Sequence, residues 1–232
     1  MTQYLVGIDI GGTKLATVVA DDNGAILHKV RQPTEARYGS DHVVSKLIQM
    51  VDQMLALVEI SRSQISAIGI SCGGPLDTTT GIVYSPPNLP DWDAVPLKKI
   101  VTTEFQVPTV IENDANASAY AEWKFGGGQG YDEVVFMTMS TGIGAGIVSK
   151  GQIYHGASDW AGEVGHQILI PNGPLCGCGN RGCLEASCSG PAIARRAQEA
   201  IQKQPETEML KLTDGKILAV KSEHVVTAAQ NG

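Results

Sequence analysis

The sequence predicts an α/β protein, and three observations carry this prediction. Short apolar runs at residues 4–10 and 65–71 are typical of strands. From 41 to 60 the apolar residues recur at the spacing of a helix with one buried face. Glycine-rich turns join several of the strand-like runs. With 232 residues, of which 43% are hydrophobic, the chain is long enough for one or two domains with real cores.

The expected elements alternate between strands and helices. In the first half we expect strands at 4–10, 15–20, 25–32, 65–71 and 109–112, with helices at 41–60 and 113–123. In the second half we expect strands at 133–140, 144–149 and 152–154, a helix from about 189 to 204 and a further short amphipathic helix. The Gly/Pro-rich stretch 73–96 is expected to be a long binding loop. Each half opens with strands joined by glycine turns, so we expect two domains, 1–115 and 116–232.

Charge and composition exclude several classes of function. The net charge is −7 and no Lys/Arg-rich stretch interrupts it, which argues against nucleic-acid or membrane partners. No run approaches the roughly 18 apolar residues of a membrane helix, and the first residues do not resemble a signal peptide. The five cysteines are therefore expected to be reduced thiols or metal ligands in a cytoplasmic protein.

Two glycine-rich loops each join one strand to the next. The first is DIGGTK at 9–14, where backbone N–H groups lie beside a hydroxyl and a cation, and where Asp9 is suited to hold Mg²⁺. The second is STGIGAG at 140–146. We interpret the pair as a cradle for a chain of phosphates. The alternative for each loop is a purely structural hairpin turn.

A third motif, ENDAN at 112–116, lies where a strand leads into a helix. Asp114 sits near the junction of the two halves, which is the usual place for a substrate cleft. The alternative is that Asp114 is an ordinary helix cap.

The most specific motif combines His166 with three cysteines in the pattern C-x-C-x4-C, namely Cys176, Cys178 and Cys183. A Cys₃His set suits tetrahedral Zn²⁺, and the intervening glycines let the chain curl around an ion. The alternative is three reduced cysteines in a tight loop. Glu163 and Glu185 flank this motif, and each alone is more often a solvated acid. Together with a zinc-bound imidazole they suit a polyhydroxyl ligand such as a sugar.

The motifs together resemble those of the ROK sugar kinases and repressors, within the hexokinase and actin superfamily. They are DIGGTK at 9–14, GGPLD at 73–77, NLPDW at 88–92, ENDANA at 112–117, STGIGAGI at 140–147, GEVGH at 162–166 and CGCGNRGCLE at 176–185. The resemblance covers essentially the whole chain. It implies a two-domain actin/hexokinase-like (ribonuclease H-like) ATPase fold with a central cleft. The N-terminal domain is expected to bind phosphate, and the C-terminal domain sugar and zinc.

Carried over residue by residue, the resemblance implies ATP-dependent phosphorylation of a hexose, first of all glucose at the 6-hydroxyl, with Asp114 as the catalytic base. It places sugar hydroxyls at Gly74, Asn88, Asn113, Asp114, Glu163, His166 and Glu185. It places the phosphates of ATP, with Mg²⁺ near Asp9, between Gly11, Gly12, Thr13 and Lys14 on one side and Thr141 and Gly142 on the other. It places structural Zn²⁺ at His166, Cys176, Cys178 and Cys183. We also expect a homodimer.

The sequence departs from the family in one respect. It lacks the family's later Gly-Gly adenosine motif and final helix, so we interpret it as a C-terminally truncated chain whose adenine binding and activity are in question. Two alternatives remain beside a glucose kinase: a non-catalytic sugar-binding module, and a kinase for fructose, mannose, allose or an N-acetylhexosamine. A repressor is disfavoured, because only eight residues precede Asp9.

Overall fold

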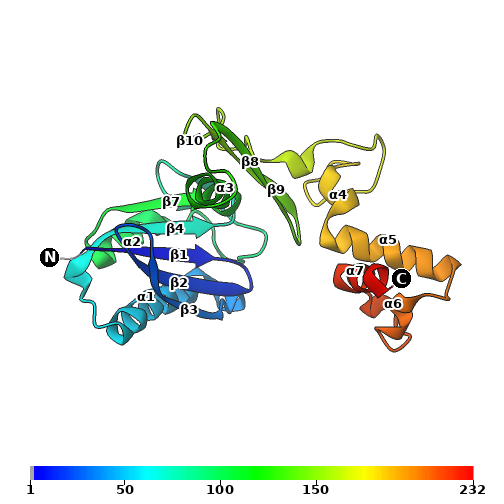
Figure 1. Cartoon of the computed structure of the whole chain (residues 1–232), viewed down its shortest axis with the longest axis horizontal. Helices are drawn as coiled ribbons and strands as arrows, with labels where there is room; N and C mark the ends of the chain where they lie inside the picture. The colour runs from blue at the N-terminus through cyan, green and yellow to red at the C-terminus, as the bar shows by residue number, and fades with distance from the viewer. Residues whose placement is uncertain (1–2, 232) are drawn as a thin grey trace. The chain divides into compact units, whose positions relative to one another are not determined.

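The computed structural model describes residues 3–231, which form two compact units. One unit extends to Ala117 and the other begins at Ser118, within a helix that both units share. Each unit has its own sheet (Figure 1). The functional roles that the sequence suggested for the two halves remain proposals.

The first unit is built on a five-stranded sheet in the order β3-β2-β1-β4-β7. Its strands are β1 (Tyr4–Ile10), β2 (Lys14–Asp21), β3 (Ile26–Pro33), β4 (Ile65–Cys72) and β7 (Thr109–Asn113). The first three strands are antiparallel neighbours, whereas β1, β4 and β7 run parallel. The carboxyl ends of these three strands therefore meet at one edge of the sheet, where α/β proteins commonly bind ligands.

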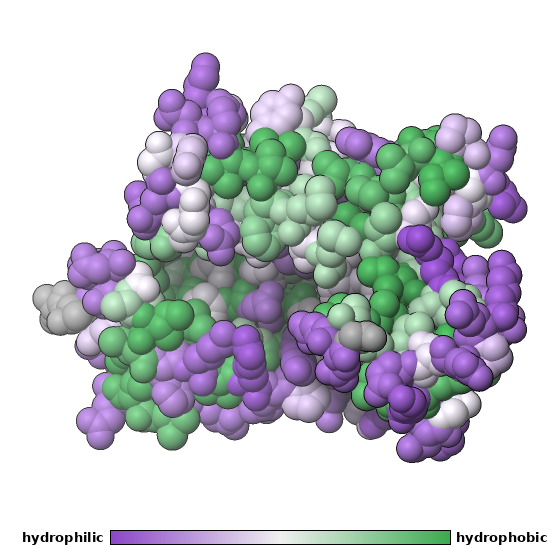
Figure 2. Space-filling model, turned by 45° about the vertical axis from the view of Figure 1, so that its right-hand side comes forward, coloured by the Kyte–Doolittle hydropathy of each residue, from purple (hydrophilic) through white to green (hydrophobic). Residues whose placement is uncertain are grey.

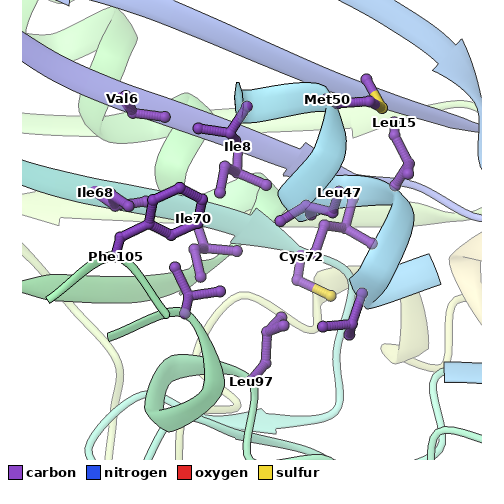
Figure 3. Packing of buried hydrophobic residues seen from close by; sticks show 14 of the residues in the cluster. Val6, Ile8, Leu15, Leu47, Met50, Ile68, Ile70, Cys72, Leu97 and Phe105 are labelled. Carbon is purple, nitrogen blue, oxygen red and sulfur yellow. The ribbon is translucent and has the colours of Figure 1, made fainter. Parts of the chain in front are cut away.

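Helices α1 (Gly39–Leu57) and α2 (Leu97–Phe105) pack with the sheet around one core, part of which Figure 3 shows. From Val6 onward every second residue of β1 is buried, and α1 buries side chains at helical spacing. The core includes Val6, Ile8, Leu15, Leu47, Met50, Ile68, Ile70, Cys72, Leu97 and Phe105. The large core makes this unit a rigid support for the loops at its edge.

The stretch 73–96 is less irregular than its composition suggested. It contains a short hairpin of β5 (Leu76–Asp77) and β6 (Ile82–Val83), and α2 follows it directly. Two 3₁₀ turns, η1 (Ala36–Tyr38) and η2 (Arg62–Gln64), flank α1. The shared helix α3 (Asp114–Phe125) then leads into the second unit.

The second unit holds a three-stranded sheet in the order β10-β9-β8 and a group of helices. Its strands are β8 (Glu133–Met139), β9 (Ile143–Ser149) and β10 (Gln152–Ile153); its α-helices are α4 (Leu184–Cys188), α5 (Gly190–Lys203), α6 (Glu208–Lys211) and α7 (Ser222–Asn231). Two 3₁₀ turns, η3 (Val164–His166) and η4 (Ile217–Ala219), complete it. Helix α5 begins as the sequence predicts, with the Ser189 hydroxyl accepting from the Ala192 N–H.

Burial differs between the units. The described part of the second unit has two small buried clusters, one around Cys176 and Cys183 and one around Ile201 and Val220. Large apolar side chains of β8, such as Val135 and Met137, remain exposed. Hydrophobic areas are visible among the hydrophilic residues on the face shown in Figure 2. Within residues 3–231, no helix combines the length and apolar character that crossing a membrane requires.

Candidate functional site

The first glycine-rich loop is the turn between β1 and β2. The Gly11 N–H donates to the Lys14 carbonyl at 3.0 Å, which closes the turn. A Cβ atom on Gly12 would lie 2.5 Å from the Cβ of Asn88 and 2.7 Å from the Asn88 carbonyl oxygen, so only glycine fits there. The loop expected to bind phosphate and the loop that carries Asn88 therefore touch, while Thr13 and Lys14 remain exposed.

Three polar residues share one row across the carboxyl edge of the sheet. Asp9, Ser71 and Glu112 are paired in register on β1, β4 and β7. Asp9 accepts a hydrogen bond from the Ser71 hydroxyl at 3.1 Å through Oδ1. Asp9 is exposed, and its carboxylate suits Mg²⁺, which prefers oxygen ligands. No sequence pattern singled out Ser71, because a lone serine in an apolar strand carries no signal.

Asp114 lies one residue beyond β7, near the same edge. The residue is exposed to solvent, yet partial burial of its carboxyl group raises the pKa of Asp114 above its ordinary value. The Ala115 N–H donates to Asp114 Oδ1 at 2.8 Å and opposes the rise, whereas the negative charge of Asp9 adds to it. Raised carboxyl pKa values are common at functional sites, so this one makes Asp114 a candidate proton acceptor.

Neighbouring side chains determine where α3 begins. The Asn113 side-chain oxygen accepts from the N–H groups of Ala115 at 2.9 Å and Asn116 at 3.4 Å, so Asn113 caps the helix. Glu112 in turn accepts from the Asn113 N–H at 2.8 Å and from the Asn116 amide at 3.0 Å. The capping task that was the alternative for Asp114 is therefore carried at least in part by Asn113. A Cβ atom on Gly74 would lie 3.4 Å from the Asn113 amide nitrogen, which places these two predicted sugar contacts side by side.

The second unit presents the other glycine-rich loop between β8 and β9. The Ser140 N–H donates to the Gly142 carbonyl and the Gly190 N–H donates to the Ser140 carbonyl, both at 2.9 Å. The loop is thus tied to the first turn of α5. A pocket of about 530 Å³ lies beside it, and Thr141 and Lys221 are among its lining residues. No sequence pattern singled out Lys221, which is about 80 residues from Thr141 along the chain.

The Cys₃His residues come together in the same unit, with their potential ligand atoms all within 4.8 Å of one another. Tetrahedral zinc, with bonds of about 2.3 Å to sulfur and about 2.0 Å to nitrogen, requires S···S and N···S separations near 3.8 and 3.6 Å. The Cys178 and Cys183 sulfurs are 3.7 Å apart, and the Cys176 sulfur is 3.6 Å from His166 Nδ1. The donor set therefore fits Zn²⁺ in both chemistry and spacing.

The potential metal ligands also contact polar groups around the cluster. With Nδ1 facing the thiols, His166 Nε2 lies 3.7 Å from a Glu163 carboxylate oxygen. A metal on Nδ1 would fix the remaining proton on Nε2, which then serves as a donor. The Asn180 backbone N–H lowers the pKa of the Cys178 thiol, which favours the thiolate form that binds metal, whereas burial raises the pKa of the neighbouring Cys183 thiol.

Glu185 links the metal-binding cluster to the second glycine-rich loop. Its Oε2 accepts from the Ile143 N–H at 2.8 Å, and its Oε1 lies 3.8 Å from the Cys176 sulfur. Sequence reasoning assigned Glu185 to sugar hydroxyls only and missed both contacts, because it did not predict α4, the five-residue helix that carries Glu185.

Comparisons with known proteins agree on one family. Residues 5–230 match the model of the ROK family. A glucokinase of Streptomyces coelicolor is 39% identical over 233 residues, covering 98% of this chain and 70% of that protein. A xylose repressor of Bacillus subtilis is 33% identical over 210 residues, covering 90% of this chain and 54% of the repressor.

A solved structure supports the same assignment. The crystal structure of a ROK family glucokinase from Streptomyces griseus, in complex with glucose and AMPPNP, is 36% identical with a TM-score of 0.78. The match covers 99% of this chain and 72% of that chain. The α/β fold is thus the actin/hexokinase-like fold of the ROK sugar kinases. The motif order, the match over residues 5–230 and these similarities lead to one conclusion: the chain belongs to the ROK family.

Proposed function

We propose that this chain transfers the terminal phosphoryl group of ATP to a hexose, with glucose phosphorylated at its 6-hydroxyl. The observation that carries the proposal is Asp114, whose carboxyl has a raised pKa and lies at the carboxyl edge of the parallel strands. Similarity to glucokinases supports the choice of substrate class. The resemblance to a xylose repressor favours sugar binding but not catalysis, so it supports only the weaker alternative.

Asp114 acts as the general base in this proposal. It accepts the proton of the sugar hydroxyl as the oxygen attacks phosphorus, and a raised pKa makes the ionised carboxylate a stronger acceptor. Phosphoryl transfer otherwise depends mainly on positioning and on neutralising charge. The cap at Asn113 fixes the start of α3 and so holds Asp114 in place.

The nucleotide is assigned to the glycine-rich loops. Gly11, Gly12, Thr13 and Lys14 offer backbone N–H groups, a hydroxyl and an ammonium group to the phosphates, and Thr141 and Gly142 offer a second loop. Asp9 would hold Mg²⁺, which when bound neutralises charge on the phosphates.

Each unit offers polar groups that suit a sugar. Glu163 and the Nε2 of His166 offer an acceptor and a donor, while Asn113, Asn88 and Gly74 offer polar groups at the edge of the first sheet. Both Glu185 oxygens have partners within the protein. Glu185 therefore divides its hydrogen-bond accepting capacity between the loop and the sugar. Zn²⁺ at the Cys₃His cluster would shape this region and would not take part in the reaction.

The experiment measures ADP release by the purified protein with MgATP and a panel of sugars: glucose, fructose, mannose, allose and N-acetylated hexosamines. We expect turnover with the highest kcat/KM for glucose. Binding of each sugar is measured in parallel by calorimetry. Sugar binding without ADP release would favour the non-catalytic module, and a higher kcat/KM for another sugar would replace glucose as the substrate.

A further inference from the structure

A buried threonine donates two hydrogen bonds to the first glycine-rich loop. Thr34 follows β3 and has no solvent exposure. Its N–H donates to the Thr13 carbonyl at 3.0 Å, and its hydroxyl donates to the Gly11 carbonyl at 2.5 Å. Both acceptors belong to the loop, so Thr34 determines the direction of two of its carbonyl groups.

The direction of a carbonyl also determines the direction of the next N–H group. The peptide between Gly11 and Gly12 is planar and trans, so an oxygen that points to Thr34 turns the Gly12 N–H to the opposite side. Backbone N–H groups turned outward in this way are the groups that bind phosphate. The backbone of Asn88 closes off the Cβ side of Gly12. The loop is therefore held by Thr34 and Asn88 together.

Thr34 is itself fixed on both flanks. The ammonium group of Lys46, on α1, donates to the Pro33 carbonyl and to a Glu35 carboxylate oxygen, both at 2.7 Å. Lys46 is mostly buried, and its contact lowers the pKa of Glu35. Helix α1 packs into the core of the unit. A continuous set of contacts thus runs from the core through Lys46 to Thr34 and on to the loop.

We propose that Thr34 is a positioning residue for nucleotide phosphates, acting through the Gly11 carbonyl; this inference rests on the proposed function. Burial in this sheet does not by itself require a threonine hydroxyl to hold a loop. Thr17 of β2 is equally buried, and its hydroxyl has no hydrogen-bond partner among the described residues. The two threonines therefore provide a matched pair for a test.

The test compares Thr34→Val, Thr34→Ser and the control Thr17→Val in the same chain. Valine keeps the shape of threonine and removes the hydroxyl, whereas serine keeps the hydroxyl. In Thr34→Val we expect the KM for ATP to rise roughly fivefold to tenfold, the range expected for one lost hydrogen bond, with the sugar KM within about twofold of wild type. Thr34→Ser and Thr17→Val are expected to match the wild type.

Hydrogen exchange of residues 9–16 without ligand gives a second readout. We expect faster exchange in Thr34→Val alone, because the turn closed by Gly11 and Lys14 loosens. Equal behaviour of Thr34→Val and Thr17→Val in both measurements would overturn the inference. So would a Thr34→Val variant whose ATP and sugar KM values rise together with a general loss of stability. If the wild type uses no ATP, the proposed function fails, while the exchange data still decide whether Thr34 holds the loop.

Discussion

The carboxyl group of Asp114 must be ionised to act as a base, yet its surroundings favour the protonated form. Burial and the charge of Asp9 both raise its pKa, and hydrogen bonds from the backbone N–H groups of Ala115 and of Asp114 itself act in the other direction. The ionised carboxylate, which is the form that acts as a base, therefore destabilises the fold. Such destabilisation is common at catalytic positions.

Asp114→Asn tests the base directly. Asparagine keeps the shape and can still accept from the Ala115 N–H, but it cannot take up the proton of a sugar hydroxyl. We expect kcat to fall by about 10²–10⁴ with a nearly unchanged sugar KM. Steady-state kinetics with glucose measure this. If Asp114 is only a helix cap, asparagine serves equally well, and near-normal kcat would reject the base assignment.

The same variant has an expected effect on stability. A raised pKa means that the folded protein binds this proton more tightly than the unfolded chain, so ionisation of Asp114 costs stability. The cost is absent below the ordinary value of 3.8 and is complete above the raised folded pKa. We therefore expect Asp114→Asn to melt above the wild type at pH 7.5 and to lose this advantage as the pH falls toward 4. An advantage that is constant with pH would show that charge is not its cause.

At this scale the sequence predicts residues whose partners are close along the chain. The Cys₃His set is recognisable because three of its ligands lie within eight residues, and Asp114 because it follows a strand end. Thr34 is not recognisable, because its hydroxyl bonds to Gly11, 23 positions away. Ser71 reaches Asp9 across 62 positions and is hidden for the same reason.

Among the elements, the turn between β1 and β2 depends on the absence of a side chain at Gly12. In Gly12→Ala the new methyl group would meet Asn88 backbone at 2.7 Å, so one of the two loops must move. Overpacking of this kind costs about 1–3 kcal/mol. We expect a lower melting temperature and at least tenfold weaker binding of both ATP and sugar, measured by calorimetry.

Gly69→Ala is the matched control for this prediction. Gly69 lies within β4, and a Cβ atom there would meet no atom within 4 Å. We expect wild-type affinities for both ligands. If Gly12→Ala also binds ATP and sugar normally, the contact with Asn88 does not constrain the loop.

Elements with strong periodicity were predicted, and among the short ones β10 was predicted but the hairpin of β5 and β6 was not. The expected helix at 41–60 corresponds to α1, and all strands of the main sheet occur within two residues of their expected bounds. The hairpin of β5 and β6 has two residues a side, too few for an alternating pattern. Helix α2 buries Leu97, Val101 and Phe105 at a spacing of four, which is a helical pattern. The pattern was not recognised because it directly follows the Gly/Pro-rich stretch 73–96. Tertiary contacts, rather than local preference, define such short elements.

Over the whole molecule, the two units have different sources of stability. The first has one large core of sheet and helix residues. The described part of the second has only small clusters, and one of them contains Cys176 and Cys183, two of the four potential metal ligands. A small core is often supplemented by a structural metal, whose binding energy is then part of the folding energy.

We therefore expect metal removal to destabilise the second unit and spare the first. Metal analysis of the purified protein should give about one zinc per chain. In Cys178→Ser, or after chelation, hydrogen exchange should accelerate in residues 163–188, while β1 and β4 stay protected. Glu185 joins the cluster to the Ile143 N–H, so the loop at 140–143 should loosen as well.

Cys188→Ser is the control. Because Cys188 lies outside the Cys₃His set, this variant should retain zinc. Equal deprotection of both units would mean that the metal stabilises the chain as a whole, and full zinc occupancy in Cys178→Ser would remove Cys178 from the ligand set.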